Sequence, residues 1–314
     1  MYCHVESELQ EYSFSVKHRI KKTIFYFVKV CISFGLIWFA LRRVDPENLW
    51  NYVHSLPAHL IFLTVLGSAV NLILQFIRFR LIIDECQHQV STPDLLKVFF
   101  LGFAFRLTIP GGHGEAAKML FIQGGTRNRI TAYGLEKITI SVVILFLLGP
   151  AIVFLFPQHK AFLLVSLIPL VGIVLLYRLK GKPWIKKWQL VGTHYTNIAI
   201  KTALLTVVIY GVFISQYWIL LRLYSIDWLT VAAICILVMG ASALPISVSG
   251  LGIRENTTAW LLADYGVAPA IGVGVPLVVF VLNVVIPALI GGVILLTLKK
   301  KDQKPEYKFL LKES

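Results

Sequence analysis

Charged residues are scarce in this chain of 314 residues. They make up 15% of it, whereas an ordinary globular domain has about 25%. Hydrophobic residues account for 57%, and several uncharged runs reach the roughly 20 residues that a membrane-spanning helix needs. No loop is long enough to bury a core of its own, which excludes an additional soluble domain. Because lipid offers the backbone no hydrogen-bond partner, we predict an all-α polytopic membrane protein, with residues 1–314 forming a single transmembrane domain.

Several functional motifs are also missing. There is no Gly-x-x-x-x-Gly-Lys-Ser/Thr loop for ATP, no serine-hydrolase elbow and no His-Glu-x-x-His zinc motif. Acidic and polar residues fill positions 6–13, so the amino terminus does not resemble a cleavable signal peptide. The four cysteines show no close pair and no metal spacing, so we expect reduced thiols, no metal and no cofactor. They are Cys3, Cys31, Cys86 and Cys235.

The charge that is present is mostly basic, with 30 Lys and Arg against 16 Asp and Glu and a net charge of +14. These basic residues collect in short loops between apolar runs, which is the pattern of cytoplasmic loops in membrane proteins. We therefore expect contact with anionic lipids rather than nucleic acid. The basic flanks at residues 1–22 and 299–314 predict that both termini are cytoplasmic, in a protein of the cell membrane.

The apolar runs predict six full spans and two interrupted segments. The interrupted segments divide into short arms around Pro-Gly breaks, the first at 95–109 and 115–122 and the second at 229–249 and 256–263. We interpret each as a re-entrant helical hairpin, because every basic loop then lies on one side of the membrane. The six full spans are expected at residues 23–41, 58–77, 132–156, 161–177, 198–221 and 266–298.

This order gives two halves, residues 23–156 and 161–298, each with three spans and one hairpin. Three crossings are an odd number, so the second half is inverted relative to the first. An inverted-topology repeat with broken helices near the midplane is typical of transport proteins. An arrangement of eight full spans is the alternative.

The first interrupted segment carries ionisable residues on both sides of its break. Arg106 precedes Pro110, which stops the incoming arm, and Gly112 gives the backbone freedom at the tip. Glu115 and Lys118 follow one turn apart, where they can pair with each other. The guanidinium of Arg106 suits a phosphate oxygen or a carboxylate.

The second interrupted segment repeats this composition. A proline breaks the arm, serine and glycines form a polar tip, and an Arg-Glu pair opens the outgoing helix. Because charges at membrane depth are expensive, we interpret both clusters as functional. The alternative is that Glu115 pairs with Lys118 or Arg106, and Glu255 with Arg254, only to lock the hairpins. The residues of this second cluster are Pro245, Ser249, Gly250, Gly252, Arg254 and Glu255.

Other polar residues lie within or beside the spans. Glu136 and Lys137 either face the first hairpin or form an interfacial flank. His113, at the first tip, could titrate near neutral pH. Four amides within spans are expected to form hydrogen bonds between helices: Asn71, Gln75, Gln216 and Asn283.

The two clusters resemble the signature of the lysylphosphatidylglycerol synthase transmembrane-region family. The matching pieces are Pro110-Gly-Gly-His-Gly-Glu115 with Lys118, then Glu136-Lys137, and Leu244-Pro-Ile-Ser-Val-Ser-Gly-Leu-Gly-Ile-Arg-Glu255. Lys118 stands where this signature has an arginine. The resemblance implies translocation of polar lipids between leaflets. Some members add a soluble aminoacyl-transferase domain. We expect no such domain here, so the resemblance does not imply lipid aminoacylation.

We therefore predict a flippase or transporter for an anionic phospholipid, glycolipid or polyprenyl-phosphate lipid, with membrane lipids as its partners. The site would comprise the residues of both clusters named above together with Glu136 and Lys137. One alternative is a membrane-bound transferase acting on a lipid-linked substrate, with Glu115 as its acid or base. Another is a membrane partner that transports nothing, and a homo-oligomer is compatible with any of these.

Overall fold

The computed structural model describes residues 46–86, 90–108, 114–122, 125–179, 193–243 and 250–301. Every regular element in these ranges is a helix, which confirms the predicted all-α fold. The predicted first span at 23–41 and the tail at 1–22 lie outside the described residues. So do five highlighted residues of the hairpin tips: Pro110, Gly112, His113, Pro245 and Ser249.

Within the described ranges, five helical stretches are long and apolar enough to cross a membrane. Each overlaps one of the five spans predicted after residue 57, so the multi-pass membrane architecture is confirmed. Large apolar side chains such as Phe62 and Leu204 face outward, as expected for surfaces in contact with lipid. The spanning elements are α3 (Ala58–Cys86), α5 (Thr126–Leu155), η2 with α6 (Pro157–Ser166 and Leu167–Leu179), α8 (Thr193–Leu220), and α11, η4 and α12 in succession (Pro269–Phe280, Val281–Val285 and Ile286–Lys301).

The two interrupted segments form pairs of short helices. The first pair is α4 (Thr92–Thr108) and η1 (Gly114–Phe121), of 17 and 8 residues. The second is α9 (Trp228–Ser242) and α10 (Ile253–Ala263), of 15 and 11 residues. Each helix is shorter than the roughly 20 residues of a full crossing. In each pair the two helices pack against one another.

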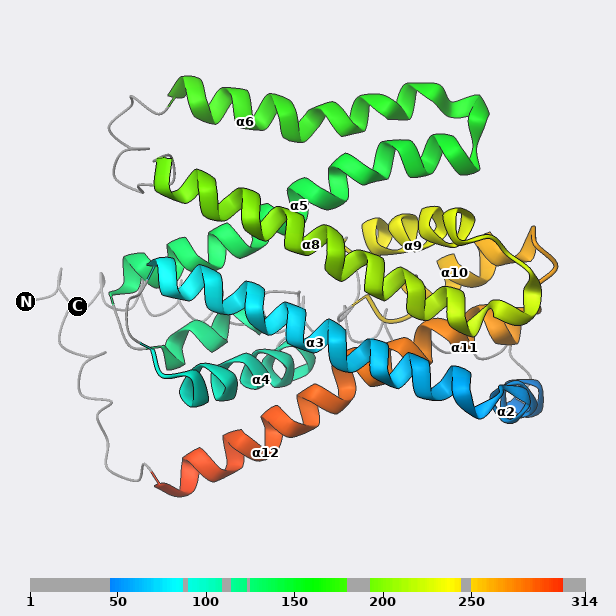
Figure 1. The fold of residues 1–314 in the computed structure, drawn as a ribbon, viewed down its shortest axis with the longest axis horizontal. Helices are drawn as coiled ribbons and strands as arrows, with labels where there is room; N and C mark the ends of the chain where they lie inside the picture. The colour runs from blue at the N-terminus through cyan, green and yellow to red at the C-terminus, as the bar shows by residue number, and fades with distance from the viewer. Residues whose placement is uncertain are drawn as a thin grey trace, which may run out of the picture.

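The paths of these pairs are visible in Figure 1. There α3 ends, α4 begins and α5 begins at the left end of the molecule, whereas α8 ends and α9 and α11 begin at the right end. Each pair therefore enters and leaves at one end, as a re-entrant hairpin does, and the two hairpins enter from opposite ends. The inverted relation between residues 23–156 and 161–298 stays a prediction.

Helix α3 is longer than predicted. The span was expected to end at residue 77, before Arg78, but the helix continues to Cys86. Arg78 is consequently buried inside the molecule, with 6% of its surface exposed. Arg80, two residues later, is exposed and pairs with Asp84 at 3.3 Å. The prediction was wrong for Arg78 because it treated the first charge after an apolar run as the membrane boundary.

Packing around the two hairpins divides the core into two main clusters. One surrounds α4 and η1 and includes Phe79, Phe99 and Met119, and the other surrounds α9 and α10 and includes Tyr217 and Val231. At the right end in Figure 1, the short helix α2 (Pro46–Ser55) is tied to α8 by a hydrogen bond of 2.5 Å from Tyr52 Oη to the carbonyl oxygen of Leu220. A single turn, η3 (Arg222–Tyr224), then leads toward α9.

The contact between α12 and α4 depends on Gly291. A Cβ atom added there would collide with the carbonyl group of Phe100, whose carbon lies 2.6 Å from that position. Small residues allow such close approach of helices in membranes. Gly291 therefore serves close helix packing, whereas a Cβ at the adjacent Gly292 would meet nothing within 4 Å.

We predict that Gly291→Ala destabilises the protein by about 1–3 kcal/mol, because the added methyl overpacks the contact between α4 and α12. Thermal unfolding of the purified protein in detergent measures the effect. Gly292→Ala is the matched control, one residue away in the same helix, and should leave the midpoint unchanged or slightly raised. Equal effects of the two substitutions would contradict the close contact.

The hairpin topology is tested by single cysteines on a cysteine-free background. Ser91→Cys and Thr126→Cys flank the first hairpin and should react with a membrane-impermeant maleimide from the same side. Arg222→Cys and Tyr265→Cys flank the second hairpin and should both react from the opposite side. Labelling of Ser91→Cys and Thr126→Cys from different sides would favour eight full spans instead.

Candidate functional site

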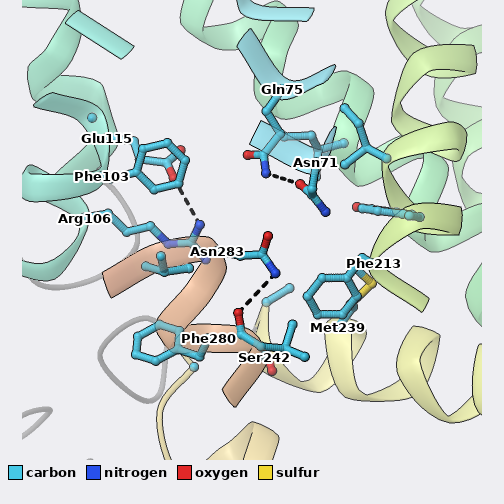
Figure 2. Close-up of a pocket in the computed structure, with 18 of the residues that line it drawn as sticks. Asn71, Gln75, Phe103, Arg106, Glu115, Phe213, Met239, Ser242, Phe280 and Asn283 are labelled. Atoms are coloured by element: carbon cyan, nitrogen blue, oxygen red, sulfur yellow. Dashed lines mark hydrogen bonds and ion pairs between the residues drawn. The ribbon is translucent and has the colours of Figure 1, made fainter. Parts of the chain in front are cut away.

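A cavity of about 680 Å³ lies in the middle of the molecule, between the two hairpins. The first hairpin contributes Arg106 and Lys118 to its wall, and the second contributes Ser242 and Arg254. Helices α3, α5, α8 and the junction of α11 with η4 complete the wall, and Figure 2 shows part of it. Two segments 135 residues apart in the sequence therefore line one cavity.

Glu115 connects three elements at this cavity. It lies in the first turn of η1, and its carboxylate accepts from Arg106 Nη1 on α4 at 3.3 Å (Figure 2). Its second oxygen lies 2.5 Å from Lys137 Nζ on α5. These two pairs join α4 and η1 to the spanning helix α5.

Glu136 forms a second, more deeply buried group with two cations. Lys118 Nζ lies 3.0 Å from one carboxylate oxygen, and Arg78 Nη2 lies 4.0 Å from the other. Arg78 also donates to Thr206 Oγ1 on α8 at 3.1 Å. The ammonium of Lys118 stands 4.4 Å from the centre of the Phe79 ring, a favourable cation–π contact.

A glycine makes room for the Lys118 side chain. A Cβ atom at Gly102 on α4 would lie 2.8 Å from Lys118 Cδ. The absence of a side chain at this position lets Lys118 pass beside α4 and reach Glu136. The ion pair between Lys118 and Glu136 thus depends on the absence of a side chain at Gly102.

The second hairpin carries its own ion pair at the start of α10. Arg254 Nε donates to Glu255 Oε1 at 3.0 Å, and the backbone N–H of Gly252 donates to Glu255 Oε2 at 2.6 Å. Glu255 thereby caps the first turn of α10. Gly252 and Gly250 have φ angles of 82° and 75°, which favour glycine, and Gly250 packs closely against Ser242. The guanidinium of Arg254 lies 4.3 Å from the centre of the Phe280 ring.

Positive charge exceeds negative charge on the wall of this cavity. Such an excess inside an apolar protein favours an anionic ligand. Among the described lining residues, five are cationic (Arg78, Arg106, Lys118, Lys137 and Arg254) and two are anionic (Glu115 and Glu136). Because Glu255 neutralises Arg254, two positive charges remain in excess.

Amide side chains join the spanning helices around the cavity. Gln216 on α8 donates to Ser68 Oγ on α3 at 2.6 Å and accepts from Asn283 Nδ2 on η4 at 2.8 Å. Gln75 donates to Asn71 within α3 at 2.5 Å. The expected hydrogen bonds between helices are confirmed for Gln216 and Asn283, whereas the bond between Gln75 and Asn71 stays within one helix.

The pairing of charges differs in part from the expected one. Glu136 and Lys137 face the first hairpin, which decides between the two interpretations that the sequence left open. Among the described residues no ion pair joins Glu115 to Lys118, because Lys118 instead reaches Glu136 on α5. The predicted pairs Arg106 with Glu115 and Arg254 with Glu255 are present.

Sequence reasoning missed Arg78 and all the aromatic residues of the cavity wall, among them Tyr210, Tyr217 and Phe280. A signal for Arg78 was available. It is followed by Phe79 and by an apolar run from Leu81 to Ile83, which indicates that the helix continues beyond the arginine.

The family model described as "Lysylphosphatidylglycerol synthase TM region" matches residues 26–291. That range covers most of the chain and contains every described residue of the cavity wall. The chain belongs to this family. Membership confirms the resemblance predicted from the two hairpin sequences and associates the protein with membrane lipids. Among curated proteins, none matches the chain.

We predict that Glu255→Gln destabilises the protein by about 3 kcal/mol, because it leaves the buried Arg254 without its carboxylate. The double substitution Arg254→Met/Glu255→Gln should recover part of this loss, because it removes both charges. Thermal unfolding in detergent measures both variants. Asp264→Asn, an exposed carboxylate just after α10, is the control and should change the midpoint little. A double variant that is less stable than Glu255→Gln would contradict the pairing.

Proposed function

We propose that the protein moves an anionic phospholipid, glycolipid or polyprenyl-phosphate lipid between the two leaflets, with the headgroup held in the central cavity. The observation that carries the proposal is the cavity itself, which both hairpins line and which has two positive charges in excess once Arg254 is paired with Glu255. A phosphate group would supply the negative charge that the two carboxylates do not. The apolar outer surfaces of α3 and α8 suit the acyl chains.

The hairpins suggest how the headgroup would cross. Broken helices that enter from opposite faces bring polar groups to the midplane of the membrane, where transport proteins hold their substrates. In the proposed cycle, Arg106, Lys118 and Arg254 attract the headgroup. Glu115 holds two cations, and one of these cations would exchange its partner from Glu115 to the phosphate as the halves move. Because the chain has no ATPase motif, transport is downhill or coupled to an ion.

The proposed orientation follows from basic residues at one end of the molecule. Arg129 at the start of α5, Arg178 at the end of α6 and the lysines at the end of α12 belong to the end drawn on the left in Figure 1. By the positive-inside rule this end is cytoplasmic. The protein would then be a component of the cell membrane with both termini inside.

The state of Glu115 favours transport over a transferase reaction. A transferase would need an acid or a base beside its lipid-linked substrate. Glu115 accepts from two cations at 3.3 Å and 2.5 Å. Both carboxylate oxygens are thus engaged by cations of the protein, so neither is free to take a proton from a substrate.

Transport is tested with purified protein in vesicles that contain an anionic lipid labelled with a fluorophore on its acyl chain. Dithionite, added outside, quenches the label as it reaches the outer leaflet. We predict that wild type accelerates this exchange and that Arg78→Gln slows it at least tenfold, because the cavity loses a buried cation. Headgroup analysis by mass spectrometry should show the lipid unchanged, whereas a transferase would alter it.

Arg80→Gln is the matched control for this experiment. It removes the same charge from the same helix, two residues away, but Arg80 is exposed and pairs only with the exposed Asp84 among the described residues. Exchange by Arg80→Gln should equal that of wild type. Equal rates for Arg78→Gln and Arg80→Gln, with both variants properly inserted, would overturn the assignment of the cavity as the transport site.

A further inference from the structure

The charged groups occupy only part of the cavity wall. In Figure 2, Arg106 and Glu115 lie on the left side of the cavity, and Asn283 projects into its middle. Asn71 and Gln75 lie above Asn283 in this view. Tyr217, from α8, also lines the cavity. A phosphate bound by the cations would therefore have uncharged polar side chains as neighbours, and these could bind another part of the headgroup.

Asn283 presents an acceptor without a partner. Its Nδ2 donates to Gln216 Oε1 at 2.8 Å and to the carbonyl oxygen of Val279 at 3.1 Å, so both of its protons are used. These two bonds fix the orientation of the amide. Its Oδ1 is buried and has no hydrogen-bond partner among the described residues.

The hydroxyl group of Tyr217 is a second buried polar atom of this kind. The residue is fully buried, and its Oη has no hydrogen-bond partner among the described residues. Buried polar atoms are nearly always paired, because an unpaired one loses its hydrogen bonds to water without replacement. Both residues line the cavity, and an unpaired acceptor and hydroxyl there are suited to a ligand that brings hydroxyl groups.

The backbone at Asn283 is also specialised. Residues Val281–Val285 form a π-helical segment between α11 and α12, and such segments occur frequently at functional sites. The π-helical segment contains Asn283, the residue that projects into the cavity. The adjacent Phe280 and, on α8, Phe213 add apolar surfaces that suit the C–H faces of a sugar or polyol.

We propose that the cavity has two subsites: the cation cluster for a phosphate, and a hydroxyl subsite formed by Asn283 and Tyr217. The preferred ligand is then a lipid phosphodiester whose headgroup carries free hydroxyl groups, as a polyol or a sugar does. This inference rests on the proposed function, because it takes an anionic lipid as the ligand and adds what the other part of the headgroup must be.

Two short-chain lipids test the hydroxyl subsite directly. Dioctanoyl phosphatidylglycerol and dioctanoyl phosphatidylpropanol have the same acyl chains and the same single negative charge, and differ only in two hydroxyl groups. Titration of the purified full chain in detergent, followed by microscale thermophoresis, gives a Kd for each. Wild type should bind the glycerol lipid about tenfold more tightly, which corresponds to one or two net hydrogen bonds.

Variants assign this preference to residues. Tyr217→Phe removes only the hydroxyl and should reduce the preference, and Tyr217→Phe/Asn283→Leu should abolish it while the Kd for phosphatidylpropanol stays constant. That constant Kd also shows that the variants are folded. Arg106→Gln should raise the Kd of both lipids by the same factor, because it removes a cation that binds the phosphate group common to both. Tyr265→Phe, outside the cavity, is the control and should change neither Kd.

The outcomes separate this inference from the proposed function. Equal affinity of wild type for both lipids would overturn the hydroxyl subsite and leave the anionic-lipid site standing. A preference that survives in Tyr217→Phe/Asn283→Leu would also overturn it. Binding of neither lipid would overturn both proposals. Competition by glycerol 3-phosphate at concentrations equal to those of the lipid would assign the site to a soluble phosphate ester and overturn the lipid as its source.

Discussion

The cost of a charge away from water is the constraint on which this structure depends. An unpaired ion in the interior of a membrane protein costs several kcal/mol, so each charge there needs a partner or a ligand. Glu115 and Glu136 each hold two cations, and those cations come from α3, α4, η1 and α5. The two carboxylates therefore determine how the first hairpin sits against the spanning helices.

Uncharged residues make these pairs attainable. Gly102 leaves space for the Lys118 side chain beside α4, and Gly250, which has a positive φ, packs closely against Ser242. Each hairpin breaks near the middle of the molecule, so its charged residues lie around one cavity rather than at the two membrane surfaces. The breaks in the helices are therefore what brings the buried charges of the two hairpins together.

Much of this fold could be predicted from local sequence, because apolar runs set the spans and Pro-Gly breaks set the hairpins. The partners of Lys118 could not be predicted, since they depend on how α5 packs against η1. Arg78 and Arg80 show a related limit. They are two residues apart on α3, about 200° around the helix axis, so one faces the cavity and the other faces outward. The predicted end of the span at residue 77 put both arginines outside the membrane.

The balance of charge distinguishes a binding site from a structural lock. Arg254 and Glu255 form a neutral pair that also caps α10, so Glu255 serves to hold the second hairpin in place. The group around Glu115 and Glu136 is different, because four cations share two carboxylates. A network that served only to lock the hairpins would be more stable with its charges balanced. The imbalance is what an anionic ligand would correct, and the atoms of Asn283 and Tyr217 that lack a partner among the described residues support the proposal that its headgroup carries hydroxyl groups.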